Sequence, residues 1–192
     1  VNQLRVYHPG SYMTLDATTQ RSLGLVCNLT DASRRHTLLE VLDQTSTSMG
    51  GRMLRAWILQ PLRDSAEIGR RLDAVESFAR SHASRQCAAE LLRGISDLER
   101  IVSRAACRTA NARDLLALRN SLRQMPPLRE LLATRAPAGA DPDANAPPLV
   151  QALAARLDPM PELAARLEAA VNDNPPVTVR EGGLIKPGYH PP

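Results

Sequence analysis

Three arginines are the residues whose spacing most directly suggests chemistry. Arg100, Arg104 and Arg108 recur at every fourth position, and side chains four residues apart share one face of an α-helix. A guanidinium group binds phosphate through paired hydrogen bonds, so this row could contact a nucleic-acid backbone. The competing interpretation is a solvated helix face, because Glu99 interrupts the row and no aromatic side chains are interleaved with it for bases to stack on.

The remaining reactive residue types form no catalytic or cofactor-binding pattern. A phosphate-binding loop needs a lysine followed by Ser or Thr, but the single lysine, Lys186, precedes Pro187. Neither the four histidines nor the three cysteines occur at the spacing of metal ligands. We therefore expect no catalytic residue, no bound cofactor and no metal site in this segment, and we expect that it is not itself an enzyme.

The composition favours a helical bundle. Hydrophobic residues make up 43% of the 192 residues but aromatic residues only 3%, so the core must be aliphatic, whereas strands favour β-branched and aromatic side chains. A chain of this length forms one domain or two small ones. No apolar run is long enough for a membrane span, and three cysteines without a disulfide pattern indicate a reducing, cytoplasmic location. The net charge of +4 permits a nucleic-acid partner without requiring one.

Apolar periodicity and capping residues predict nine helical stretches. They span residues 17–23, 33–44, 49–59, 64–78, 84–93, 96–105, 111–132, 149–157 and 161–171. The apolar seam of the longest stretch continues through Pro126 and Pro127, which predicts one kinked rod or two collinear helices rather than a reversal of the chain. Residues 135–148 are rich in Ala and Pro and predict a flexible loop. A β-like, extended stretch is predicted at 177–179. The expected fold class is therefore an all-α bundle with a short extended C-terminal tail.

Several short motifs then occur in a recognisable order. Residues 37–45 read T-L-L-x-V-L-D-x-T, and residues 49–62 read M-G-x-R-x-L-x-x-W-x-x-x-P-L. Four further segments agree in order and spacing: L-D-x-x-T from 15, R-L-D-A-V-E at 71–76, G-I-x-D-L-E-R at 94–100, and the tail 180–189. Together they resemble the core, or lever, domain of the MutS family of DNA mismatch-repair ATPases. The sequence departs from the family pattern at Ser22 and Gly24, and the 135–148 loop resembles an insertion.

The resemblance implies a division of labour. Residues 1–14 would end a preceding connector region, residues 15–176 would form the helical lever, and residues 177–192 would begin a clamp region that leads on into a longer chain. In the family, a domain before this one reads the mismatch and a domain after it hydrolyses ATP. This segment would then couple the ATPase state to the DNA clamp. ATP and magnesium would bind in the missing C-terminal part, and the partners of the parent protein would be DNA, a second copy and a MutL-type repair protein, with no membrane.

Four residues stand out as structural or coupling candidates under this resemblance. Gly50, or its neighbour, would supply a backbone conformation or a close approach that a Cβ atom forbids. Trp57 would anchor the core with its ring N–H on a backbone carbonyl, and Arg52 and Pro61 complete the set. Two alternatives stay open: a stand-alone helical nucleic-acid-binding module that uses the arginine row, and the lever of a MutS paralogue that controls recombination.

Overall fold

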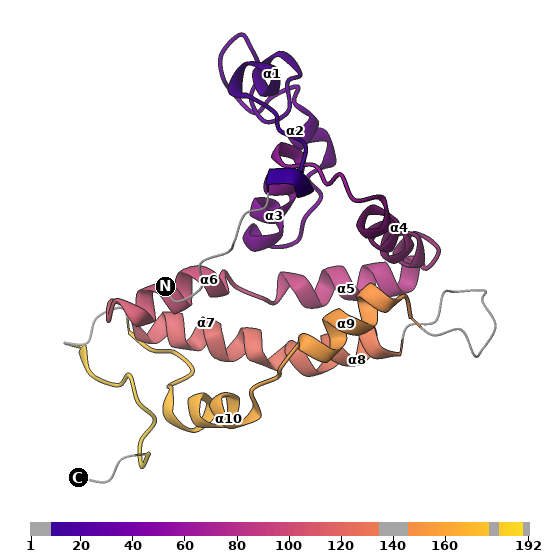
Figure 1. Cartoon of the computed structure of the whole chain (residues 1–192). Helices are drawn as coiled ribbons and strands as arrows, with labels where there is room; N and C mark the ends of the chain where they lie inside the picture. Colours follow the sequence, from indigo (N-terminus) through magenta and orange to yellow (C-terminus); the bar gives the residue numbers. More distant parts are fainter. Residues whose placement is uncertain (1–8, 135–145, 177–180, 190–192) are drawn as a thin grey trace. The chain divides into compact units, whose positions relative to one another are not determined.

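The structure, a computed structural model, describes residues 9–134, 146–176 and 181–189 (Figure 1). Over these ranges the elements are helices joined by loops, with only isolated β-bridges, which confirms the all-α class. The elements are η1 (Pro9–Ser11), α1 (Ala17–Ser22), α2 (Leu38–Leu42), α3 (Ser48–Leu59), α4 (Ser65–Ala79), α5 (His82–Arg93), α6 (Leu98–Ala106), α7 (Ala112–Arg123), α8 (Met125–Ala133), α9 (Pro148–Arg156) and α10 (Pro161–Ala170). Backbone contacts divide the chain into a first unit, Val1–Val75, and a second unit, Glu76–Pro192.

The first unit is built on a small aliphatic core beside α2 and α3. The buried residues of this core are Leu25, Val26 and Leu39, and parts of α3 pack against them. Side-chain caps start the surrounding helices: the Asp16 carboxylate accepts the Thr19 amide hydrogen at 2.6 Å at the start of α1. α1 ends at Ser22, one residue before the predicted end at 23, and Gly24, which follows the C-cap Leu23, takes the left-handed conformation at φ +57°.

The helix predicted at 33–44 is wrong over its first half, because only α2 is helical there. At residues 33–35 the Ser33 hydroxyl accepts the Arg35 amide hydrogen at 3.2 Å, and the Asn28 side-chain amide donates to the Arg35 carbonyl at 3.2 Å. Such local side-chain bonds compete with helix formation. His36 then adopts a left-handed φ of 58°, and Thr37 caps α2 by accepting the amide hydrogen at position 40. The real start of the helix is therefore its capping threonine.

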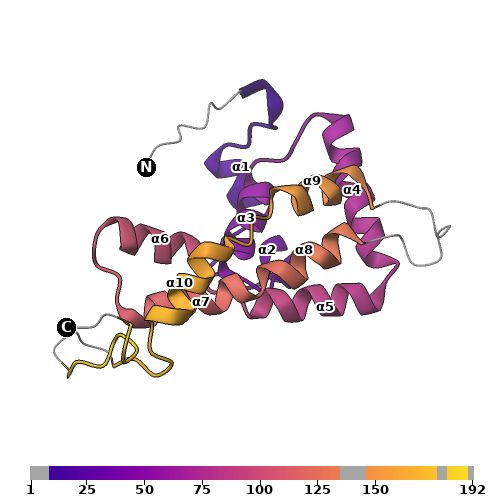
Figure 2. The same ribbon diagram turned by 90° about the horizontal axis from the view of Figure 1, so that it is seen from below.

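The second unit contains three pairs of consecutive helices, and we call each pair a rod, whether straight or bent: α5 with α6, α7 with α8, and α9 with α10. Helices α5 and α9 pack on α8, while α6 and α10 pack on α7 (Figures 1 and 2). The core between the rods is aliphatic, as the composition predicts. Its buried apolar side chains include Ile101, Leu122, Met125, Leu128, Val150, Ala154, Leu167 and Val171.

The middle rod confirms the prediction of collinear helices across two prolines. Only Gln124 separates α7 from α8, and its φ and ψ of −82° and −14° keep the backbone close to helical. The predicted cap at Asn111 is also confirmed, in a capping box with Asp114. The stretch predicted at 96–105 begins too early, because the cap of α6 is Asp97, whose carboxylate accepts the Arg100 amide hydrogen at 3.3 Å.

The last described segment returns to α10. Val171 and Ile185 form an antiparallel bridge, and the Lys186 amide donates to the Ala170 carbonyl at 2.9 Å. The predicted extended stretch at 177–179 and the predicted loop, apart from residues 146–148, lie outside the described residues. Within the described ranges, no helix combines the length and the apolar character needed to cross a lipid bilayer.

Candidate functional site

The arginine row does not form as the sequence predicts. Arg100 and Arg104 lie on α6, but α6 ends at Ala106 and Arg108 takes a left-handed φ of 57° beyond it. The amide of Thr109 donates back to the Arg104 carbonyl at 2.9 Å, which is the hydrogen-bonding pattern of a helix end that reverses the chain. The prediction that all three arginines share one helix face is therefore wrong, because the chain must turn here to enter α7.

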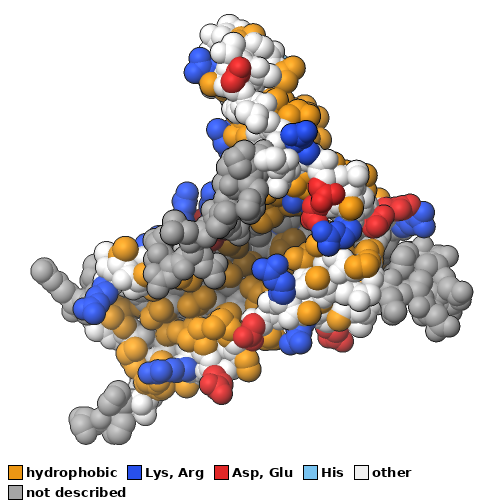
Figure 3. All heavy atoms as spheres, viewed as in Figure 1, with side chains coloured by type: hydrophobic (Ala, Val, Ile, Leu, Met, Phe, Trp, Pro, Cys, Tyr) orange, Lys and Arg blue, Asp and Glu red, His pale blue; other side chains and the backbone are white. Residues whose placement is uncertain are grey.

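The two arginines on the helix have partners within the protein. Arg100 Nε lies 3.3 Å from Oδ2 of Asp97, the N-cap of the same helix. Arg104 pairs with Asp114, the carboxylate that also closes the capping box at the start of α7. In the view of Figure 3, arginine side chains are dispersed among acidic and hydrophobic ones. Arg104 thus fastens α6 to α7, and the row presents no set of free guanidinium groups.

A buried arginine that sequence reasoning missed lies in the second unit, on the side of α7 that faces the segment after α10. Arg119 of α7 is 4% exposed. Its Nη1 donates to Asp173 Oδ1 at 2.8 Å and to the Val171 carbonyl at 3.4 Å. Its Nε has no hydrogen-bond partner and lies 3.6 Å from Glu168 Oε2, a distance for charge attraction only. No local sequence pattern predicts these contacts, because the acidic partners of Arg119 lie about fifty residues further along the chain.

The same acidic residues hold two further cations. Arg123, one turn after Arg119, pairs with Glu168. Lys186 Nζ donates to the Glu168 carbonyl at 2.8 Å and lies 3.6 Å from Asp173 Oδ2. The hydrogen bond from Arg119, aided by the nearby charge of Lys186, lowers the pKa of the Asp173 carboxyl group. This cluster fastens α7, α10 and the segment around Lys186 to one another, and we call it the Arg119 cluster.

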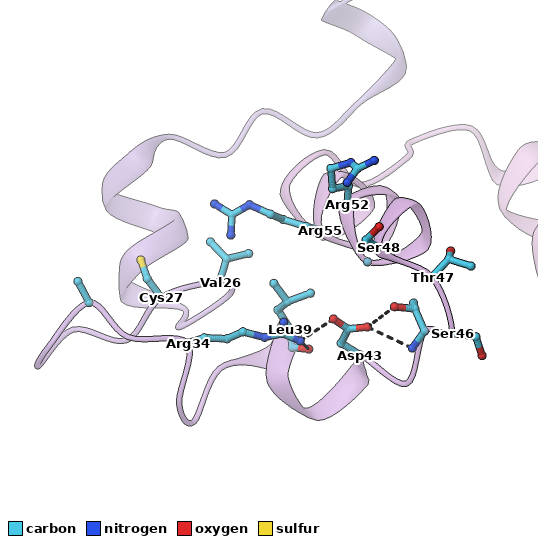
Figure 4. A pocket seen from close by; sticks show the side chains of 13 residues that line it. Val26, Cys27, Arg34, Leu39, Asp43, Ser46, Thr47, Ser48, Arg52 and Arg55 are labelled. Atoms are coloured by element: carbon cyan, nitrogen blue, oxygen red, sulfur yellow. Dashed lines mark hydrogen bonds and ion pairs between the residues drawn. The ribbon is translucent and has the colours of Figure 1, made fainter. Parts of the chain in front are cut away.

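In the first unit, an open cavity of about 880 Å³ lies at the N-terminal end of α3 (Figure 4). Arg34 and Arg55 extend into it from opposite sides, and the candidate Arg52 also lines it. Asp43 accepts hydrogen bonds at 2.6 Å from the Thr45 hydroxyl and from Arg34. These two bonds, with that of Thr45 the larger cause, lower the pKa of Asp43. The cavity wall is therefore rich in cations and hydroxyl groups, with one ionised carboxylate among them.

Gly50 makes a close approach rather than an unusual backbone conformation. It lies in the first turn of α3, and its amide donates to the hydroxyl of Thr47, the N-cap, at 3.0 Å. A Cβ atom on Gly50 would lie 3.0 Å from the same hydroxyl oxygen. The positive-φ glycines of the described residues lie elsewhere. Of the two roles expected for Gly50, the structure fits the close approach.

Trp57 does not anchor the core of this chain. Its side chain is 46% exposed, and the described residues provide no hydrogen-bond partner for its ring N–H. The guanidinium carbon of Arg71, on α4, lies 4.0 Å from the centre of the indole ring, within the range of a cation–π contact. The prediction that Trp57 is a buried anchor is therefore wrong. Arg71 of α4 contacts one face of the indole ring, and much of the side chain stays exposed to solvent.

Pro61 follows the end of α3, as predicted, and also takes part in a pairing that the sequence did not reveal. Its carbonyl accepts the Met13 amide hydrogen at 2.8 Å, next to an antiparallel bridge between Tyr12 and Leu62. The backbone at residues 12–13 is thereby paired with the residues that follow α3. Over the described ranges, no group of three or more His, Cys, Asp and Glu side chains could hold a metal ion.

Comparisons with known proteins give one consistent result. The family model described as MutS domain III matches residues 18–187. The DNA mismatch repair protein MutS of Pelotomaculum thermopropionicum is 45% identical over 190 residues, which cover 99% of this chain and 21% of that protein. The DNA mismatch repair protein MutS of Geobacillus kaustophilus is 43% identical over 184 residues, which cover 96% of this chain and 19% of that protein. The chain thus spans about a fifth of the length of these curated relatives.

Proposed function

The chain belongs to the MutS family of DNA mismatch-repair proteins, as the part called domain III, and on this premise we propose that it is a mechanical coupler without catalytic chemistry of its own. It would transmit the nucleotide state of an ATPase domain to the clamp that closes over DNA. The observation that carries this proposal is the family match over nearly the whole chain. The architecture supports it, because the helices of the second unit pack directly on one another. A packed helix transmits a displacement along its length because it does not deform like a loop.

The Arg119 cluster supports this role in the second unit. It joins α7 to Asp173, in the segment after α10, and Asp173 lies near Lys186, within residues 177–192, the proposed start of the clamp region. A movement of the α7 rod would therefore carry the exit segment with it. At the other end of the chain, residues 1–14 would belong to the connector region, and residues 15–176 would form the lever between the two.

The other partners belong to the whole parent protein. The sequence of this segment lacks a phosphate-binding loop, so ATP and magnesium would act in the part of the parent that follows. DNA, a second copy of the parent and a MutL-type repair protein would be met by the assembled protein, in the cytoplasm. No observation favours a stand-alone nucleic-acid-binding module, because Arg100 and Arg104 already pair with carboxylates.

A salt titration of the purified chain against duplex DNA tests this proposal. We expect negligible affinity at moderate salt and no measurable ATP hydrolysis. Sub-micromolar binding with a steep dependence on salt concentration would instead identify a DNA-binding module. The variant Arg108→Gln is a useful companion, because Arg108 has no ion-pair partner among the described residues. A loss of binding in this variant would assign the DNA contact to this end of α6.

A further inference from the structure

Six helices of the second unit sort into two groups. Helices α5 and α9 pack on α8, and we call these three the α8 group. Helices α6 and α10 pack on α7, and we call these three the α7 group (Figures 1 and 2). Each rod contributes one helix to each group. In each rod, one or a few residues that belong to neither helix separate the two helices, and we call these residues an interruption. The chain passes from one group to the other at the interruption.

Each interruption lacks the hydrogen bonds that stiffen a helix. The first is Gly94–Asp97, between α5 and α6. The second is Gln124, where Pro126 and Pro127 have no amide hydrogen to donate to the carbonyls four residues earlier. The third is Leu157–Met160, which contains a proline and ends in a left-handed φ of 47° at Met160. Helices bend where such bonds are missing, so all three rods are weakest at their interruptions.

Two of the interruptions lie against each other. A Cβ atom on Gly94 would lie 2.9 Å from the Cγ and Cδ atoms of Gln124, so only a glycine fits there without a shift of that side chain. The Ser96 amide donates to the hydroxyl of Ser121 at 2.9 Å, and this fully buried hydroxyl donates to the Ala117 carbonyl at 2.7 Å. The first two rods are thus interrupted at the same level and are in direct contact there.

We propose that these interruptions together form a hinge, about which the α8 group and the α7 group move as two bodies. The axis passes near Gly94 and Gln124, where the two rods are in close contact. The Arg119 cluster lies wholly on α7, α10 and the segment after α10, so it moves with the α7 group. The meaning of this hinge for coupling rests on the proposed function, but its existence is a property of this chain alone.

Two native cysteines allow a direct test. Cys87 is exposed on α5 in the α8 group, and Cys107 is exposed at the end of α6 in the α7 group. In a Cys27→Ser background, nitroxide labels on both would lie on the order of 30 Å apart along the first rod. Pulsed electron paramagnetic resonance then gives the distribution of this distance. We expect a broad distribution that narrows by about half in the variant P126A/P127A, because two restored amide donors stiffen the middle rod.

A pair of labels within one group is the matched control. Cys87 with Glu130→Cys, in a Cys27→Ser and Cys107→Ser background, joins α5 to α8, and its distribution should be narrow in every variant. The variant Gln124→Gly should broaden the Cys87 to Cys107 distribution further, so the hinge is tested in both directions. A parent distribution as narrow as the control, or no response to either variant, would overturn the hinge. That result would leave the proposed coupler intact, since a rigid unit also transmits motion, whereas tight DNA binding would overturn the coupler without changing this distance.

Discussion

Arg119 Nη1 donates to Asp173 Oδ1 at 2.8 Å, and this contact joins a side chain that is 5% exposed to one that is 62% exposed. Arg119 lies on α7 and Asp173 in the segment after α10, so the two residues are far apart in the sequence. The arginine has little access to water, so it depends on its partners, while the carboxylate can be hydrated without it. The contact is therefore asymmetric, and substitutions at Arg119 report on the packing of α7 against the segment after α10.

The variant Arg119→Ala should lower the free energy of unfolding by about 2 kcal/mol, because it removes a buried side chain and its hydrogen bonds. Arg119→Met keeps most of the volume without a buried charge, and should cost less than half as much. Chemical denaturation of the purified chain measures both. Arg123→Ala is the matched control, since this exposed arginine pairs with the same Glu168, and it should change stability by only about 0.5 kcal/mol. Equal effects of Arg119→Ala and Arg123→Ala would contradict this assignment.

The Asp173 carboxyl group should show the effect of Arg119 directly in its titration. Its pKa is lowered from 3.8 in the folded protein, so the ionised form stabilises the fold above about pH 4 and this contribution disappears as the pH falls through the folded pKa. Carboxyl carbon NMR of the Arg119→Met variant should show the pKa of Asp173 rising toward 3.8. Asp16, whose pKa is lowered by its bond from the Thr19 amide, should titrate as before. An unchanged Asp173 would rule out Arg119 as the main cause.

The contact between Arg71 and Trp57 should be visible in fluorescence, because Trp57 is the only tryptophan. Arg71→Gln removes the cation from the ring face, and we expect a red-shifted emission, faster quenching by acrylamide and a loss of stability of about 0.5 kcal/mol. Arg70→Gln is the control, since Arg70 is exposed on the same helix and pairs with Glu67. If both variants give the same spectrum, the indole ring is not covered by Arg71 in solution.

Two helical glycines should respond to alanine to different extents. Gly69 lies within α4 and a Cβ atom there would meet nothing within 4 Å, so Gly69→Ala should stabilise the chain by about 0.5 to 1 kcal/mol through helix propensity. Gly50→Ala gains the same helix propensity, but its Cβ atom presses on the Thr47 hydroxyl. Its gain in stability should therefore be smaller than that of Gly69→Ala, or absent. Thermal unfolding of the two variants side by side decides this. A larger gain in stability at Gly50 than at Gly69 would contradict this, because it would show that the Thr47 side chain moves aside without cost.

The sequence predicts the parts of this fold that depend on local chemistry. The few aromatic residues indicate the aliphatic bundle, Asn111 marks the start of α7, and the seam through Pro126 indicates the collinear pair of helices. The ordered motifs indicate the family. What the sequence does not reveal depends on contacts between distant segments. Nothing near Arg119 in the sequence indicates that it would be buried against Asp173.

The errors have the same origin. The arginine row fails at Arg108 because the spacing of four residues continues past the point where the chain must turn into α7. Trp57 was expected inside because a single tryptophan commonly fills a core, but in this chain Arg71 from the next helix covers one face of the ring. The helix expected before Leu38 fails because the Asn28 side chain donates to the Arg35 carbonyl and His36 takes a left-handed φ. In each case, a tertiary or side-chain contact overrides a periodic pattern.

The most direct test of the proposed coupling uses the full-length protein that carries this domain. The measurement is the ratio of mismatched-DNA affinities with and without ATP, in the parent and in Arg119→Ala, with Arg123→Ala as the matched control. If the α7 rod and its fastening transmit the nucleotide state, Arg119→Ala should reduce this ratio about fivefold or more while basal ATP hydrolysis stays unchanged. An unchanged ratio in a folded Arg119→Ala protein would contradict the account.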